Sequence, residues 1–361
     1  MTIDEVRSGP ARRAVIVGTG LIGGSIGLGL RRAGWYVTGR DADSAKSQLA
    51  RELGALDAEG DDPIADLTFV CTPVGVIADE VRRALTVGEG LVTDVGSVKT
   101  PMLDLMADPR YVGGHPMAGS ELEGVDGARA DLFEGATWVL TPTPETDDRA
   151  FTTVRSVVAS LGAEVVALAP ERHDTMVALV SHVPHLAAAT LMSLADRRST
   201  EQRALLRLAA GGFRDMTRIA AGHPGIWPDI CAENRTAIVD ELDQLIEALG
   251  QMRDVVEKND RDGLIEVLER ARRARVSLPA RFGRPDELTE IRVPIPDRTG
   301  ALAEITTLAT ELDVNLADIE IAHSAEGREG VLILLVEIAQ TDRLVDGLRV
   351  AGFRPSARAL Q

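Results

Sequence analysis

The feature that most constrains the fold is a glycine-rich turn that directly follows a short apolar run near the start of the chain. The segment VIVGTGLIGGS places Gly18, Gly20 and Gly23 in the spacing G-x-G-x-x-G. In this pattern the first glycine permits a tight turn, the second lets the backbone approach a pyrophosphate, and the third allows close packing of helix on strand. Amides at the start of the helix, at Leu21 and Ile22, then face the phosphates. The segment therefore predicts a strand, a turn and a helix that bind a dinucleotide.

Short apolar runs alternate with amphipathic, helix-length segments as far as residue 168. Such runs, rich in β-branched residues, are typical of strands that are buried on both faces in a parallel sheet covered by helices. The runs that we expect to be strands lie at 14–18, 36–39, 67–71, 91–95, 111–114, 137–140 and 164–168. We therefore predict an α/β domain with a doubly wound, Rossmann-type sheet over residues 1–169.

The strand pattern stops after Pro170. Residues 170–280 carry long helical patterns, and one of them places Ile238, Leu242 and Leu245 on one helix face. Spacings of three and four residues are those of an amphipathic helix. We predict an all-helical second domain. Because its apolar faces exceed what one small domain can bury, we also expect it to form a dimer.

A stretch with two prolines and a glycine, residues 277–287, indicates a linker. After it, residues 288–361 show the pattern strand, helix, strand, strand, helix, strand. A segment of about seventy residues is large enough to fold independently. We therefore predict a third, small α+β domain with a ferredoxin-like arrangement.

Composition bears on partners and on location. The formal net charge is −17, so long-range repulsion disfavours nucleic acids and acidic membranes. Two cysteines, Cys71 and Cys231, do not specify a disulfide framework. The N-terminal residues lack a central apolar stretch, and no uninterrupted apolar run approaches the length of a membrane span. We therefore expect a cytoplasmic protein that binds neither nucleic acid nor membrane, and a small anionic substrate remains compatible with the charge.

The end of the second expected strand bears on the choice of nicotinamide cofactor. Asp41 lies about 20 positions after the turn, where a carboxylate accepts hydrogen bonds from ribose hydroxyls and repels a 2′-phosphate. Asp43 is a less favoured substitute. Arg40 is either a solvated surface residue or a ligand for the phosphate of NADP. We predict NAD as the cofactor, with NADP as the open alternative.

Five motifs occur in an order that resembles one enzyme family. They are GLIGGS, TDVGSVK, GGHPMAGSE, VSHVPH and GGFRDMTRIA, and the match covers essentially the whole chain. In this order they resemble the prephenate dehydrogenases of tyrosine biosynthesis. The resemblance implies NAD-dependent oxidative decarboxylation of prephenate to 4-hydroxyphenylpyruvate. It also implies that the helical domain completes the substrate site and forms a homodimer.

By this resemblance His115, in GGHPMAGSE, is the catalytic histidine. A neutral imidazole that accepts the proton of the substrate's ring hydroxyl would stabilise the carbonyl that forms there. Ser97 corresponds to a serine that hydrogen-bonds the same hydroxyl, although a serine ahead of VKTPMLDLM also fits a helix N-cap. Lys99 is expected to be structural or a weak candidate for a supporting role. Arg218, in FRDMTRIA, corresponds to the arginine that grips a substrate carboxylate.

Four further residues are expected at the substrate site. Glu121 matches an acidic position at the edge of the family's site, with a surface loop acid as the alternative. His185 is implied to contribute to the substrate pocket. A metal site formed by His182 and His185 is disfavoured because no third ligand is near them in sequence, so we expect no metal. Asp215 lies three residues before Arg218 and is placed to orient it. Gly211 permits a close approach of the backbone to a ligand.

The C-terminal domain resembles the ACT domains, which are regulatory modules that bind amino acids. PDRTGAL and VNLADIEI carry this likeness, and it implies an effector site at Asp297, Gly300 and Asn315. The expected effector is an aromatic amino acid, above all the end product tyrosine. A domain that serves only for dimerisation is the alternative.

Three other functions stay open at this point. An arogenate dehydrogenase would form tyrosine directly from a substrate that carries an ammonium in place of the keto group. A β-hydroxyacid dehydrogenase has a related fold, but we would not expect it to contain the GGHPMAGSE loop or an ACT domain. A non-catalytic sensor of dinucleotide and amino acid is the alternative from a different class. The joint presence of His115, Ser97 and Arg218 disfavours such a sensor.

Overall fold

The structure, a computed structural model, describes most of the chain. The described residues are 12–119, 124–199, 205–277, 288–296, 298, 300–323 and 329–359. They form two compact units, one of Met1–Ala187 with Ala221–Gln244 and one of Ala188–Ala220 with Leu245–Gln361. The helices α6 (Val183–Ser199) and α9 (Arg235–Glu257) each contribute residues to both units.

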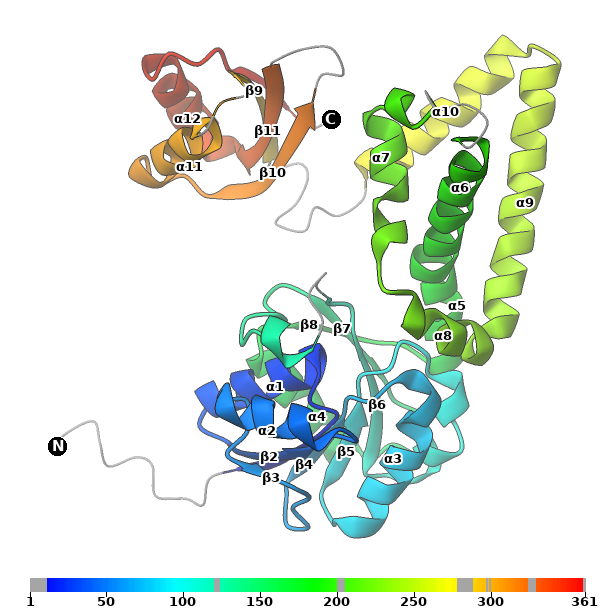
Figure 1. Cartoon of the computed structure of the whole chain (residues 1–361), viewed down its shortest axis with the longest axis vertical. Helices are drawn as coiled ribbons and strands as arrows, with labels where there is room; N and C mark the ends of the chain where they lie inside the picture. The colour runs from blue at the N-terminus through cyan, green and yellow to red at the C-terminus, as the bar shows by residue number, and fades with distance from the viewer. Residues whose placement is uncertain are drawn as a thin grey trace. The chain divides into compact units, whose positions relative to one another are not determined.

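An eight-stranded sheet forms the centre of the first unit (Figure 1). Its strands are β1 (Arg13–Val17), β2 (Tyr36–Arg40), β3 (Ala58–Glu59), β4 (Leu67–Val70), β5 (Leu91–Asp94), β6 (Tyr111–Pro116), β7 (Thr137–Thr141) and β8 (Glu164–Ala167). They lie in the order β3-β2-β1-β4-β5-β6-β7-β8. Neighbouring strands are parallel, except that β6 and β7 are antiparallel. The predicted doubly wound sheet is confirmed, with one reversal that the sequence pattern did not indicate.

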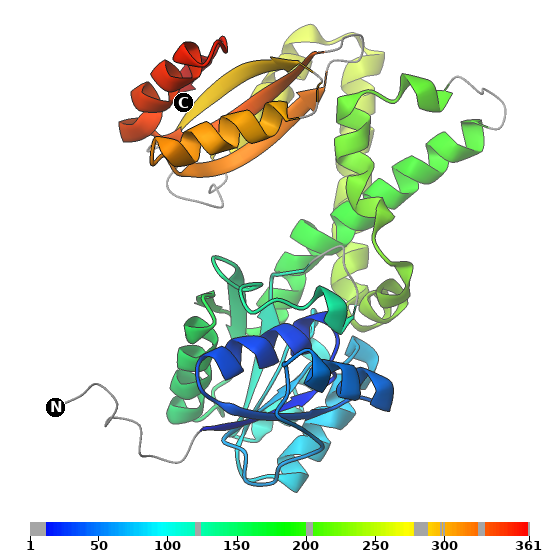
Figure 2. The same cartoon turned by 60° about the vertical axis from the view of Figure 1, so that its left-hand side comes forward.

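Helices cover both faces of this sheet (Figure 2). The helices α1 (Leu21–Arg32), α2 (Ser44–Glu52) and α4 (Asp148–Ser160) share one core with Ile16 of β1. The helix α3 (Val74–Val87) and two 3-10 helices, η1 (Thr100–Met102) and η2 (Leu105–Ala107), share another core with Val15 and Val17. Successive residues of β1 thus enter opposite cores, which explains why the whole run is apolar.

One continuous helix follows β8 in the chain. It consists of α5 (Pro170–Val177), a π-helical turn η4 (Ala178–His182) and α6. Over Pro170–Arg198 it is long and apolar enough to cross a membrane by length and composition, although the sequence shows no uninterrupted apolar run of that length. A single helix of this kind is weak support for a membrane span, because core helices of non-membrane proteins meet the same test.

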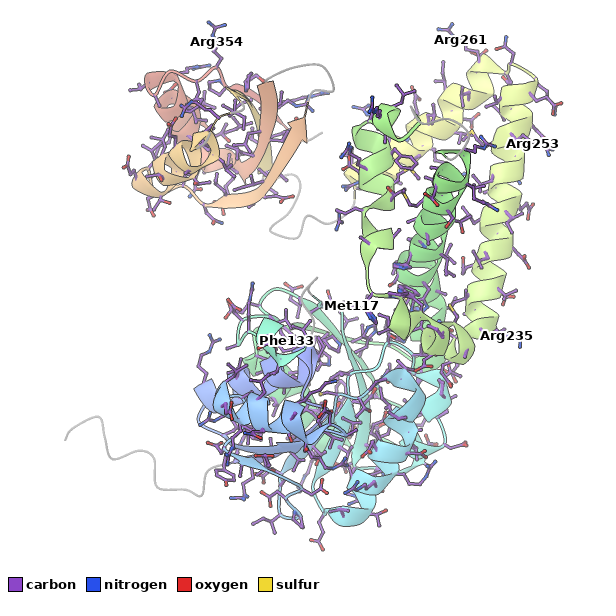
Figure 3. The ribbon with its side chains drawn as sticks, viewed as in Figure 1. Met117, Phe133, Arg235, Arg253, Arg261 and Arg354 are labelled. Atoms are coloured by element: carbon purple, nitrogen blue, oxygen red, sulfur yellow. The ribbon has the colours of Figure 1, made fainter. Side chains whose placement is uncertain are left out.

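The rest of the described chain between residues 205 and 277 is helical, as predicted. It contains η5 (Leu205–Leu208), α7 (Gly211–Thr217), η6 (Arg218–Ala221), η7 (Pro224–Ile226), α8 (Trp227–Glu233), α9 and α10 (Arg261–Val276). Basic residues such as Arg253 on α9 and Arg261 on α10 are exposed, as the side chains in Figure 3 show. The same two helices also expose large apolar side chains, among them Ile246, Leu249 and Leu268. Exposed apolar surface on neighbouring turns is typical of a protein–protein interface.

The C-terminal part of the second unit is an α+β fold. Its elements are β9 (Leu288–Pro296), α11 (Ala301–Glu311), β10 (Leu316–His323), β11 (Glu329–Glu337), α12 (Ile338–Val350) and β12 (Ser356–Ala359). The strands form an antiparallel sheet in the order β10-β11-β9-β12. Both helices pack on this sheet around a core that includes Ile291, Leu332 and Leu344. This order of elements is that of the ferredoxin-like fold, which confirms the predicted architecture.

Candidate active site

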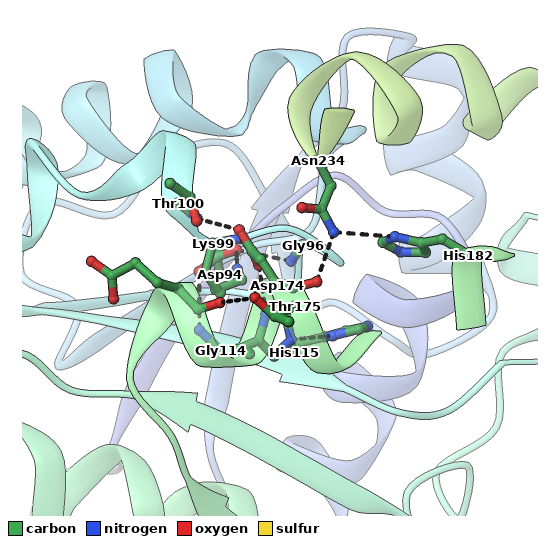
Figure 4. A network of polar contacts seen from close by, with 12 residues as sticks. Asp94, Gly96, Lys99, Thr100, Gly114, His115, Asp174, Thr175, His182 and Asn234 are labelled. Atoms are coloured by element: carbon green, nitrogen blue, oxygen red, sulfur yellow. Dashed lines mark hydrogen bonds and ion pairs between the residues drawn. The ribbon is translucent and has the colours of Figure 1, made fainter. Parts of the chain in front are cut away.

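A network of buried polar side chains lies where β5 and β6 end, beside the start of α5 (Figure 4). Asp94 is the last residue of β5, and His115 is the next-to-last residue of β6. These strands are parallel neighbours, so their carboxyl ends meet at one edge of the sheet. That edge is where open α/β sheets bind their ligands. The position alone therefore makes the network a candidate active site.

The half-buried ring of His115 is the first member of a hydrogen-bonded chain. Its Nδ1 lies 2.8 Å from Nε2 of His173, in α5. The other ring nitrogen of His173, Nδ1, lies 2.7 Å from a carboxylate oxygen of Asp174. The order from the base outward is thus imidazole, imidazole, carboxylate.

Asp174 is held by more than this histidine. Its two oxygens accept the backbone amides of Lys99 at 2.8 Å and of Thr100 at 2.7 Å. Burial alone would raise the pKa of Asp174, but the hydrogen bonds that it accepts outweigh burial and lower this pKa below its usual value. Asp174 is therefore an ionised acceptor that also caps η1, whose N-cap residue is Lys99 and not Ser97.

The ionised carboxylate fixes where the protons of both imidazoles lie. Asp174 accepts only, so His173 donates from Nδ1 and presents a lone pair at Nε2. His115 must then donate from its Nδ1, which leaves its Nε2 as an acceptor. Burial lowers the pKa of His115 well below its usual range, and repulsion from nearby groups, His173 foremost, lowers it further. The arrangement therefore presents a neutral imidazole ready to accept a proton.

A second buried carboxylate, Asp94, holds the backbone on which His115 lies. One oxygen accepts the hydroxyl of Tyr111 at 2.8 Å and the amide of Gly114 at 3.0 Å. The other accepts the amide of Gly96 at 2.8 Å and pairs with the ammonium of Lys99. Both charged side chains are fully buried. Asp94 thus ties the strand that carries His115 to the loop that carries Ser97.

Aromatic and amide groups form the side of the network that faces α8. Asn234 donates to the backbone oxygen of Asp174 at 2.9 Å and lies 3.3 Å from Nδ1 of His182. Burial is the largest cause that lowers the pKa of His182 to about 4, so this ring is neutral at pH 7. His185 stacks on Trp227 with ring centroids 3.7 Å apart. The π-helical turn that ends at His182 lies directly before this contact, and such turns are frequent at functional sites.

The glycine-rich turn has the geometry that a pyrophosphate requires. Gly18 has φ +92°, and a Cβ at this position would lie 2.6 Å from the carbonyl oxygen of Cys71. A Cβ on Gly23 would lie 1.9 Å from the carbonyl oxygen of Gly18, so helix and turn pack without a side chain between them. A Cβ on Gly20, the N-cap of α1, would meet nothing within 4 Å. This open space in front of the helix amides, which begin at Leu21 and Ile22, fits a dinucleotide.

The two residues that bear on the cofactor's ribose are held differently. Asp41 accepts the amide of Thr19 at 2.8 Å, so its carboxylate lies against the glycine-rich turn. Arg40 forms ion pairs with Asp61, at 2.7 Å, and with Glu80. Its guanidinium is thus engaged by two carboxylates, whereas Asp41 remains beside the turn.

The other predicted site residues are distributed over both units. Ser97 lies half-buried in the loop after β5, and Glu121 and Asp297 lie outside the described residues. Arg218 begins η6, where it is exposed in the second unit. The structure thus brings His115, Ser97 and His185 into one unit, without Arg218.

Four more predicted positions lie in the second unit. Gly211 and Asp215 are exposed residues of α7. Gly300 is the N-cap of α11 with φ +91°, a left-handed conformation that glycine adopts readily. Asn315 is exposed, and its backbone amide donates to the side chain of Gln340 at 3.1 Å.

Sequence reasoning missed the residues that support His115. No motif marks His173 and Asp174, although they are an adjacent polar pair at the start of a long apolar helix. Asp94 lies inside the motif TDVGSVK, where the family resemblance points to Ser97 instead. Asn234 gave no sequence signal. The signal that could have pointed to His173 is the scarcity of histidine, since the chain has only six.

Comparison with known proteins shows the family to which the chain belongs. Residues 26–167 match the family model of the prephenate dehydrogenase nucleotide-binding domain, and residues 169–270 match that of the prephenate dehydrogenase dimerization domain. Prephenate dehydrogenase from Bacillus subtilis (strain 168) is 34% identical over 334 residues, which cover 88% of this chain and 90% of the relative.

Two solved structures extend the comparison. A crystal structure of prephenate dehydrogenase from A. aeolicus, in complex with hydroxyphenyl propionate and NAD+, has a TM-score of 0.70 at 31% identity and covers 75% of this chain and 100% of that chain. A crystal structure of Synechocystis arogenate dehydrogenase has a TM-score of 0.65 at 31% identity and covers 73% of this chain and 98% of that chain. The chain belongs to the prephenate dehydrogenase family.

Proposed function

We propose that this protein catalyses the NAD-dependent oxidative decarboxylation of prephenate to 4-hydroxyphenylpyruvate, a step of tyrosine biosynthesis. The observation that carries the proposal is the chain from Asp174 through His173 to His115, which leaves Nε2 of His115 as a proton acceptor. Family membership supplies the class of substrate, and the fit of Gly18, Gly20 and Gly23 to a pyrophosphate supports the cofactor.

In the reaction that we propose, His115 accepts the proton of the ring hydroxyl as the carbon that bears this hydroxyl is oxidised. NAD, when bound, supplies the nicotinamide ring that takes up the hydride from that carbon. The ring carboxylate leaves as carbon dioxide, and its bonding electrons complete the aromatic ring as a phenolate. His115 then returns its proton to the phenolate oxygen, which gives the hydroxyl of 4-hydroxyphenylpyruvate. Aromatisation drives the reaction, so the site mainly has to position the substrate and hold an unprotonated base. Ser97, in the loop that Asp94 ties to β6, would donate a hydrogen bond at the same hydroxyl.

The substrate's carboxylates and side chain need partners of their own. We assign Arg218 to a carboxylate, and Asp215 to the orientation of Arg218, because a guanidinium fork matches a carboxylate in shape and charge. Gly211 would let the backbone approach the ligand, while His185 and Glu121 would line the pocket. The stacking of His185 on Trp227 supports this role, since it fixes the ring on the side of the network that faces α8.

Replacing Arg218 with Ala is expected to raise the KM for prephenate by about one to two orders of magnitude, since a hydrogen bond to a charged group contributes about 1.5–3 kcal/mol. The KM for NAD should change little, because Arg218 is assigned to a carboxylate of the substrate and not to the nucleotide. Steady-state kinetics with each ligand varied in turn measures both values. An equal rise in the two constants would show damage to the fold and would contradict the assignment.

An absorbance assay at the nicotinamide band, with prephenate or arogenate and with NAD or NADP, tests the proposed function. We expect reduction of NAD with prephenate as substrate. Reduction with arogenate alone would make the protein an arogenate dehydrogenase, which a similar solved structure keeps as the alternative. No reduction in any of the four mixtures would favour the non-catalytic sensor.

The assembly and location that we propose follow from the same family. The match to a dimerization domain, together with the exposed apolar side chains of α9 and α10, supports a homodimer. The two family matches meet at residues 167 and 169, which supports a nucleotide-binding domain over 1–169 and a helical domain over 170–280. We place the protein in the cytoplasm, where NAD-linked biosynthesis takes place.

Residues 288–361 are proposed to form an ACT regulatory domain that binds an aromatic amino acid, most simply tyrosine. The ferredoxin-like order of its elements and the left-handed turn at Gly300 support this. Asp297, Gly300 and Asn315 would form the binding site. A ligand there changes catalysis only through different affinities for two arrangements of the dimer.

Tyrosine is therefore expected to bind the full chain and to change its activity. Calorimetric titration with tyrosine, phenylalanine and tryptophan, paired with activity assays, measures both effects. A chain that ends near residue 283 should stay active and lose the response to tyrosine. If none of the three amino acids binds, the domain serves assembly alone.

A further inference from the structure

Arg40 lies where a nicotinamide cofactor's adenosine ribose is expected. It is the last residue of β2, and its carbonyl oxygen accepts the amide of Gly18 at 2.8 Å. The next residue, Asp41, lies against the same glycine-rich turn through Thr19. An arginine at this edge of a dinucleotide-binding sheet is the residue type that accommodates the 2′-phosphate of NADP. Its position alone would therefore favour NADP.

Two acidic side chains from other elements engage this arginine. Nε of Arg40 donates to Asp61, from the loop after β3, at 2.7 Å, and Nη2 donates to Glu80 on α3. Asp61 is also paired with Arg83, at 2.9 Å. The side chains of Arg40, Asp61 and Glu80 are each exposed by 30% or less, so water screens these pairs only in part.

The charges around the ribose edge disfavour a second phosphate. Asp41, Asp61 and Glu80 are three carboxylates, and Arg40 and Arg83 are two guanidinium groups, which leaves one net negative charge. A 2′-phosphate would have to detach Arg40 from its partners or approach the carboxylates without a counter-charge. Either route costs free energy that NAD, which has only hydroxyls there, does not require.

We propose that Asp61 and Glu80 are specificity-determining residues that hold Arg40 away from the 2′ position of the adenosine ribose. The proposal rests on NAD as the cofactor, and it explains how a chain with an arginine at this position selects NAD. It assigns the two acids a positioning role, because they act through Arg40 and not by contact with the cofactor.

Binding of two cofactor fragments tests this without any substrate. The probes are ADP-ribose and its 2′-phosphorylated form, titrated into the full chain by calorimetry. In the variant Asp61→Asn/Glu80→Gln we expect the phosphorylated probe to bind on the order of tenfold more tightly, because Arg40 is then free to donate one charge-assisted hydrogen bond to the 2′-phosphate. The affinity for ADP-ribose should stay within about twofold, since the hydroxyls that it presents gain no partner.

A matched control removes the same amount of charge nearby. Asp79 lies on α3 next to Glu80, is largely exposed and pairs with Arg82 at 2.7 Å. Glu89 is exposed just after α3. The variant Asp79→Asn/Glu89→Gln should therefore leave the affinity for both probes unchanged. Adding Arg40→Ala to the Asp61→Asn/Glu80→Gln variant should remove the gain.

The outcomes distinguish the proposed role of Asp61 and Glu80 from its premise, the nucleotide site. A gain for the phosphorylated probe that needs Arg40 and is absent from the control supports the proposal. No gain, an equal gain in the control, or a gain that survives Arg40→Ala would overturn it. Failure of the wild-type chain to bind ADP-ribose would instead remove its premise, the nucleotide site itself.

Discussion

Replacing His115 with Asn is expected to lower kcat with prephenate by about 10²- to 10⁴-fold, the range typical of a lost general base. Asn cannot accept and keep the hydroxyl proton, so the carbonyl has to form without a base. The imidazole acts on charge that develops in the transition state and not on the bound nucleotide. The Kd for NAD should therefore change little. Steady-state kinetics and a titration of NAD measure the two quantities.

The pH dependence of the wild-type enzyme gives a second test of His115. Its pKa lies well below the usual value of about 6.5, so the ring stays unprotonated as the pH falls through neutrality. The acid limb of kcat/KM should accordingly lie below the ordinary histidine range and be absent from the His115→Asn variant. Near-normal turnover of that variant would show that another group accepts the proton.

Replacing Lys99 with Met is expected to lower the free energy of unfolding by about 3–5 kcal/mol, the cost of leaving a buried charge without its partner. Lys99 and Asp94 are both fully buried, and Asp94 would keep only its neutral donors, Tyr111, Gly114 and Gly96. Urea denaturation measures the change. The repulsion from Lys99 that lowers the pKa of His115 would also disappear, so the acid limb should move to higher pH.

Two companion variants make this test specific. Lys46 is exposed on α2, and Lys46→Met should leave stability nearly unchanged. Adding Asp94→Asn to Lys99→Met should restore part of the loss, because the uncompensated charge is then gone. If Lys99→Met lost no more stability than Lys46→Met, the buried pair would not support the site.

Much of the fold was predictable because burial on both faces leaves a clear pattern in sequence. A run such as AVIVG supplies side chains to both cores of the sheet, so all its residues are apolar. The missed strand, β3, has only two residues, Ala58 and Glu59, which is too short for any periodicity. The segment expected to be one helix after Ser97 forms the two 3-10 helices η1 and η2, since Pro101 allows a first turn and Asp174 caps it from outside.

The site was predictable only in part because its support comes from contacts that are distant in sequence. His115 and Ser97 lie in motifs, but the ring that orients His115 is 58 residues further along the chain. The amides that Asp174 accepts are 74 and 75 residues before it. Neither helix periodicity nor strand alternation marks such a pair. The family resemblance that led to His115 is confirmed by the comparisons, whereas the roles of the individual residues remain predictions.

We propose that oxidation and loss of the ring carboxylate occur together on prephenate in one site. The most direct measurement is the ratio of carbon dioxide released to NADH formed when the purified protein acts on prephenate with NAD. We expect one carbon dioxide for each NADH, with 4-hydroxyphenylpyruvate as the product and both signals strongly reduced in His115→Asn. Formation of NADH without carbon dioxide would contradict it and would indicate a simple hydroxyacid dehydrogenase.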